Sequence, residues 1–119
     1  MTATPKVVFD TQIYLRALIN SRSACGRLLF EWDEHYQLYV CDEIESEIVD
    51  VLTRSKVRKS FPQITDGRVR YMISRIGMLY RVHLTQQDIE AHCRDPKDDI
   101  FLACAKVAQT DYLVSEDND

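Results

Sequence analysis

Acidic side chains follow two of the apolar runs that are typical of buried strands. Asp10 comes directly after Lys6–Phe9, and Asp117 and Asp119 follow Tyr112–Val114 within a few residues. Carboxylates that are brought together repel one another, so each needs either a raised pKa or a bound cation. A hard divalent cation with oxygen ligands, Mg²⁺ or Mn²⁺, resolves that conflict. The chemistry that such a cation supports is hydrolysis of a phosphodiester bond.

A predicted helix over residues 42–54 carries further acids. Its apolar residues recur at the spacing of one buried helical face: Ile44, Ile48, Val51 and Leu52. Glu45 and Glu47 lie on opposite edges of that face. Periodicity alone does not choose between these two glutamates as a crevice residue.

A second acidic helix, predicted over residues 97–109, begins with Asp98 and Asp99. Helical phase predicts Asp98 on the inward side and Asp99 on the wetter side, next to Lys106. The inward side also carries Phe101, Leu102 and Ala105. We therefore expect Asp98 to be the inward carboxylate.

The elements that would position these acids alternate along the chain. Strands are predicted at residues 6–9, 37–41, 80–84 and 112–114. Helices are predicted between them: one that contains Ile13, Leu15, Leu18 and Ile19, and others at residues 24–32, 42–54, 66–79, 86–93 and 97–109. Strands separated by helices indicate right-handed crossovers, a parallel sheet and the α/β class. In such sheets the functional crevice lies beyond the carboxyl ends of the strands, where Asp10 and Asp117 stand.

The length of 119 residues allows one core, so we expect a single domain over residues 1–119. No apolar run is long enough for a membrane span, and residues 1–6 lack the apolar segment of a signal peptide. The expected location is therefore the cytoplasm. The four cysteines occur singly, without the spacing of a zinc site, which favours reduced structural thiols.

The net charge of -4 is unevenly distributed. Residues 54–81 carry eight basic side chains against one acid, Asp66. Such a segment can bind a polyanion such as RNA through its phosphates, although solvated helix faces would give the same pattern. The candidate RNA contacts are Arg54, Lys56, Arg58 and Lys59. Three aromatic residues could either stack on bases or pack within the protein: Tyr14, Phe61 and Tyr71.

Four segments, taken in order, resemble the motifs of one family. Residues 7–11 (VVFDT) resemble the Asp-Thr motif that ends the first strand of PIN domains, the fold of VapC-like toxins. Residues 43–52 resemble the family's acidic helix, and the pattern selects Glu47. Residues 95–103 (DPKDDIFLA) resemble its D-P-x-D-D/N-x-F-L segment, and select Asp98. Residues 112–119 are similar to its V-[ST]-G-D-x-D ending, which selects Asp117, with Asp119 as a second candidate.

This resemblance implies a three-layer α/β/α sandwich around a central parallel sheet of four or five strands. It also implies an endoribonuclease that uses Mg²⁺ or Mn²⁺, as the toxin of a type II toxin–antitoxin pair. The metal ligands would be Asp10, Glu47, Asp98 and Asp117, joined by Asp119. Thr11 and Ser115 would orient ligands or phosphate. The expected partners are RNA, a second copy of the chain and a small antitoxin protein.

Three departures from the family pattern keep other functions open. Gln12 stands where the family usually has Asn, Glu116 replaces a usual Gly, and the chain is shorter than the family's general pattern, with one helix and one strand fewer. One alternative is therefore a PIN-like module that binds metal or RNA without catalysis. Another is a phosphatase or phosphoacceptor domain with Asp10 as the nucleophile, but Gln12 stands where the Asp-x-Asp phosphatase motif has its second Asp.

Overall fold

The computed structural model describes the backbone of residues 4–92 and 96–115, and the side chains of these ranges except those of residues 92 and 96–98. Four parallel strands form one sheet in the order β3-β2-β1-β4. The strands are β1 Lys6–Phe9, β2 Gln37–Val40, β3 Tyr80–Arg81 and β4 Tyr112–Val114. The helices are α1 Thr11–Ile19, α2 Ala24–Phe30, α3 Asp42–Thr53, α4 Ser55–Ser60, α5 Asp66–Ile76, α6 Gln86–His92 and α7 Pro96–Ala108, with a short 3₁₀ turn, η1, over Asp33–His35.

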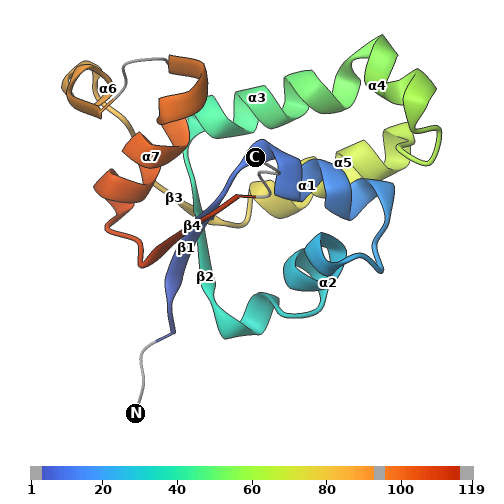
Figure 1. Ribbon diagram of the computed structural model, residues 1–119, viewed down its shortest axis with the longest axis horizontal. Coiled ribbons are helices and arrows are strands. Elements are labelled where there is room, and N and C mark those ends of the chain that lie inside the picture. The colour runs from blue at the N-terminus through green and yellow to red at the C-terminus, as the bar shows by residue number, and fades with distance from the viewer. Residues whose placement is uncertain (1–3, 93–95, 116–119) are drawn as a thin grey trace.

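Helices cover both faces of the sheet. α7 packs on β1, β2 and β4 from one face, and α1, α2 and α5 lie on the other, to the right of the strands in Figure 1. α3 contacts both α1 and α7, and so closes the top of the molecule in that view. The predicted three-layer α/β/α sandwich with a central parallel sheet is confirmed, with four strands in the part of the chain described.

The internal strand β1 is strongly apolar because helices cover both of its faces. Val7, Val8 and Phe9 of β1 are all buried, as expected for a parallel strand between two helical layers. In β2, Leu38 and Val40 are buried, whereas Tyr39 between them is half-buried. The edge strand β4 is more exposed than either of them, so the core is centred on β1 and β2.

Two predicted elements differ from the structure. The third strand was expected over residues 80–84 but covers only Tyr80–Arg81. The backbone N–H of Val82 still donates to the carbonyl of Val40, the last residue of β2. The chain then turns into α3 at Cys41, so residues 83 and 84 have no strand to pair with. A short helix, α4, was not predicted. It follows a break at Arg54, whose backbone is extended at φ -66° and ψ 132°.

Several bounds also shift by one to three residues. α2 ends at Phe30 rather than residue 32, and α5 ends at Ile76, one residue before Gly77, rather than at residue 79. No helix within residues 4–92 and 96–115 is long and apolar enough to cross a membrane. Three of the cysteines, Cys25, Cys41 and Cys104, are buried and in the reduced thiol form, as predicted, and Cys93 lies outside the described residues.

Candidate active site

The sheet order places the topological switch point between β1 and β4. The chain leaves β1 through α1 towards β2 on one side, and reaches β4 on the other side through α7. Ligands of open α/β sheets bind where the strand order reverses in this way. Phe9 and Val114 are register partners at the ends of their strands. Asp10 and Ser115, the residues that follow them, therefore lie next to each other at the carboxyl edge of the sheet.

Asp10 is held by both neighbours. Its Oδ2 accepts a 2.6 Å hydrogen bond from the Ser115 hydroxyl, and its backbone N–H donates to the Val114 carbonyl at 3.1 Å. Its Oδ1 caps α1 by accepting from the Ile13 N–H at 3.3 Å. A carboxylate at a helix N-terminus is favoured by the positive end of the helix dipole. No basic side chain in the described part of the chain pairs with Asp10, so this half-buried charge suits a cation.

The two hydroxyl residues proposed to support the site differ in exposure. Ser115 is exposed and contacts the Asp10 carboxylate directly. Thr11 is only 6% exposed, and its Oγ1 has no hydrogen-bond partner among the described residues. Of the two, Ser115 is therefore the one that the structure places against a proposed metal ligand.

The two glutamates of α3 face different surroundings. Glu45 Oε1 accepts from Nη2 of Arg81, whose Nη1 also donates to Asp42 at 2.6 Å. Hydrogen bonds and charge from Glu45 and Asp42 raise the pKa of the Arg81 guanidinium. Glu45 is thus neutralised on the β3 side of α3. Sequence reasoning did not foresee this pair, because its partners are far apart in the chain.

Glu47 lies on the opposite edge of α3, at a cavity between α3, α6 and α7. The cavity holds about 530 Å³ and is lined by Glu43, Ser46, Glu47, Asp50, Arg54, Ile89 and Ile100. Glu47 is half-buried, with its Oε2 shielded from solvent. The cavity runs along α3 from Glu43, near its start, to Arg54 at its C-cap, and reaches α7 near its start at Ile100.

The remaining predicted ligands lie outside the described side chains. The backbone of Asp98 lies in the first turn of α7, but its side chain is not described, and neither Asp117 nor Asp119 is. Among the described residues, no group of three or more His, Cys, Asp or Glu side chains is arranged to hold a metal. Of the five predicted ligands, Asp10 and Glu47 are the two whose side chains are among these residues.

The helical phase assigned to α7 holds only in part. Phe101 and Ala105 are buried and Lys106 is exposed, as predicted. Leu102 was predicted on the inward side but is 40% exposed, and Asp99 is half-buried rather than fully wet. The buried face is instead centred on Ile100, Phe101, Cys104 and Ala108. The side chain of Asp98 lies outside those that the structure describes, so the inward position expected for it stays a prediction.

Half of the basic residues in segment 54–81 are engaged by carboxylates. Four arginines form five ion pairs: Arg54–Asp50 at 2.6 Å, Arg58–Asp66 at 2.9 Å, Arg75–Asp33 at 3.5 Å, and Arg81 with both Asp42 and Glu45. The other four have no carboxylate partner in the described part of the chain: Lys56, Lys59, Arg68 and Arg70. Two of the four candidate RNA contacts, Lys56 and Lys59, therefore keep an unshared charge.

The three aromatic candidates separate by burial. Tyr14 is 1% exposed within the core, where burial raises the pKa of its hydroxyl, so the suggestion that it stacks on a base is wrong. Phe61 is half-buried and packs against the core. Tyr71 is 53% exposed, so part of its side chain is accessible to a ligand.

Comparison with known proteins supplies the family. The sequence model described as PIN domain matches residues 6–119, which include every element of the fold and every candidate ligand. No curated protein and no solved structure matched the chain. PIN domains are generally nucleases, hydrolases that act on RNA, and they typically use divalent metals. By the extent of this match, the chain belongs to the PIN domain family.

Proposed function

We propose that the protein is a metal-dependent endoribonuclease that hydrolyses phosphodiester bonds within RNA. The observation that supports it most is Asp10, held at the switch point of the sheet by Ser115 and by the start of α1, without a basic partner among the described residues. A carboxylate so placed is oriented before any ligand arrives, and its charge remains available to a cation.

The donor set fits Mg²⁺ or Mn²⁺, because every proposed ligand offers carboxylate oxygen. Asp10, Glu47, Asp98 and Asp117 would hold the ion, with Asp119 as a further candidate. A divalent cation bound there supplies stabilisation of phosphate charge and makes an attacking water more acidic. Ser115 would keep the Asp10 carboxylate in one orientation, because its hydroxyl bonds Oδ2 while the α1 amide bonds Oδ1.

Metal removal tests this proposal directly. The protein should cleave a single-stranded RNA at millimolar Mg²⁺ or Mn²⁺, and a chelator should stop cleavage. The same ion should raise the melting temperature, since a ligand at 100 times its Kd stabilises the folded state by about 2.7 kcal/mol. Gel analysis of end-labelled RNA and thermal unfolding measure the two effects. RNA binding without cleavage under any of these conditions would favour a non-catalytic module instead.

RNA would be held near the Glu47 cavity by basic side chains. Arg54 lines that cavity together with Glu47, and its surface ion pair with Asp50 is of a kind that contributes little stability and can be displaced. Lys56 and Lys59, on the adjoining α4, are exposed and have no carboxylate partner in the described residues. Arg58 is tied to the Leu52 carbonyl and to Asp66. The two lysines would therefore be the stronger phosphate contacts.

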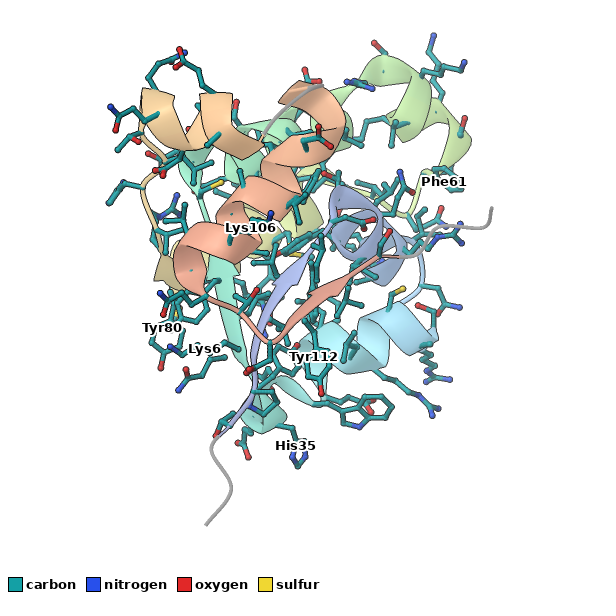
Figure 2. The ribbon with its side chains drawn as sticks, turned by 60° about the vertical axis from the view of Figure 1, so that its left-hand side comes forward. Lys6, His35, Phe61, Tyr80, Lys106 and Tyr112 are labelled. Carbon is teal, nitrogen blue, oxygen red and sulfur yellow. The ribbon has the colours of Figure 1, made fainter. Side chains whose placement is uncertain are left out.

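A salt series measures this contribution. Replacing Lys56 and Lys59 by Gln should lower the slope of log affinity against log salt by about 1.4, at roughly 0.7 for each contact with single-stranded RNA. The control replaces Lys6 and Lys106, which are labelled in Figure 2 and lie outside the basic segment, and should leave the slope unchanged. Equal slopes for wild type and the Lys56/Lys59 variant would show that α4 is a solvated face.

We further propose the role of a type II toxin in the cytoplasm, acting as a homodimer and inhibited by a small antitoxin protein. Its support is the similarity of the four motif segments to VapC-like toxins. Finding the gene of a small DNA-binding protein next to the gene of this chain, and co-purification of the two products, would test the pairing. An isolated gene whose product does not slow growth when expressed would contradict it.

A further inference from the structure

A groove between α1, α2 and α5 lies apart from the proposed active site. It encloses about 440 Å³ and shares no lining residue with the cavity at Glu47. That volume is within the usual range for small-ligand pockets, which is roughly 300–1,000 Å³. The three helices lie together on one face of the sheet in Figure 1. The function proposed above makes no use of this groove.

An exposed and well-held aromatic ring forms one wall. The Tyr71 ring lies 6.2 Å from that of Phe30, and the Arg75 guanidinium lies over both, at 5.8 Å from the first and 5.4 Å from the second. Arg75 also donates to the Tyr71 hydroxyl at 3.3 Å and to the Leu29 carbonyl at 3.1 Å. Asp33 pairs with Arg75 at 3.5 Å. Tyr71 is thus fixed in place while 53% of it remains exposed.

Two arginines without carboxylate partners in the described residues stand at the same groove. Arg22, between α1 and α2, is exposed, and no interaction of its guanidinium is found within the described residues. Arg68, on α5, donates only a long 3.4 Å hydrogen bond to the Leu18 carbonyl at the end of α1. The one carboxylate among the lining residues that the structure describes is Glu31. Two positive charges against one negative leave the groove with a net charge suited to an anion.

We propose that this groove is a subsite for single-stranded RNA, in which a base stacks on Tyr71 and the adjacent phosphates contact Arg22 and Arg68. An exposed aromatic ring combined with a positive rim is the pattern by which proteins hold single strands without reading their sequence. The inference rests on the proposed function only for the choice of RNA. It deepens that function, because a strand held here as well as at the active site would favour RNAs with a single-stranded extension beside the cut.

Base stacking is tested by comparing two oligomers of one length in the presence of a chelator. One is a single-stranded oligoadenylate and the other is its abasic ribose-phosphate equivalent. Tyr71→Ala should weaken oligoadenylate binding about 5-fold or more, and leave the abasic oligomer unaffected. Tyr71→Phe, which keeps the ring, should bind like wild type. The control Tyr112→Ala removes a more exposed tyrosine at the start of β4, labelled in Figure 2, and should change neither affinity.

The charged rim is tested in the same fluorescence-anisotropy assay. Arg22→Gln and Arg68→Gln should each lower the salt slope by roughly 0.7. Glu31→Gln should tighten binding, because it removes the repelling charge, a gain that a purely structural role would not give. Arg70→Gln is the matched control, since Arg70 is exposed on the same helix but does not line the groove. The Arg22 guanidinium makes no hydrogen bond or ion pair within the described residues, and its backbone N–H donates to Asn20 Oδ1 in either variant, so Arg22→Gln should keep the wild-type melting temperature.

The outcomes separate this inference from the proposed function. Binding that depends on Tyr71, in a protein that never cleaves RNA, would support the subsite while the nuclease proposal fails. Cleavage with unchanged affinity in Tyr71→Ala would overturn the subsite while the nuclease proposal stands. Equal weakening of both oligomers by Tyr71→Ala would also overturn base stacking. Binding of oligoglutamate in place of either oligomer would overturn it in favour of an acidic protein partner.

Discussion

Asp10→Asn should reduce RNA cleavage by more than about 100-fold, because residues that merely orient metal ligands already cost 10–100-fold when replaced. The amide keeps an oxygen that can cap α1 through the Ile13 N–H, and keeps the size that fits beside Ser115. Only the negative charge is lost. The melting temperature without metal should therefore stay near the wild-type value, so that lost activity reports the charge rather than unfolding.

Asp111→Asn is the matched control for this experiment. Asp111 also adjoins a strand and also accepts a backbone hydrogen bond, from the Lys6 N–H at 2.9 Å. It precedes β4, however, and so lies at the amino end of the sheet. Cleavage should survive this change nearly intact. Retained cleavage in Asp10→Asn, or equal losses in the two variants, would remove Asp10 from the site.

The fold was predictable where a boundary is signalled locally. β1 and β4 begin and end where expected, because each is an apolar run with a polar residue at its end. β3 was predicted too long because its length is limited by the end of its partner β2. The sequence of residues 82–84 carries no signal of where β2 ends. α4 was missed because its start is a backbone bend at Arg54, and Val57 is its one half-buried apolar residue.

The candidate site was predictable as a set of residue types, but not as a set of contacts. The rule for parallel sheets places Asp10 at the functional edge, whereas its bond to Ser115 joins residues 105 positions apart and becomes visible only in three dimensions. Likewise, counting charges over residues 54–81 overstated the free positive charge. The acids that engage Arg54 and Arg75, Asp50 and Asp33, lie outside that segment.

The choice between Glu45 and Glu47 shows the same limit. Both flank the buried stripe of α3 symmetrically, so helical periodicity does not distinguish them. The family pattern selects Glu47. The structure adds a physical difference between them. Glu45 is paired with Arg81 of β3, while Glu47 lies at a cavity near the start of α7. A glutamate already neutralised by an arginine is a poor ligand for a cation, because binding would first have to break that pair.

Glu47→Gln should consequently abolish cleavage, by more than about 100-fold, while Glu45→Gln retains most of it. Stability gives a second reading for Glu45. Glu45→Gln gives up the ion pair with Arg81, in which both side chains are 25% exposed, so its melting temperature should fall below that of the wild type. Cleavage rates and thermal unfolding of the two purified variants provide both readings. If the two variants lose activity equally, the assignment of Glu47 to the crevice is wrong, and α3 contributes to the site through its position rather than through one carboxylate.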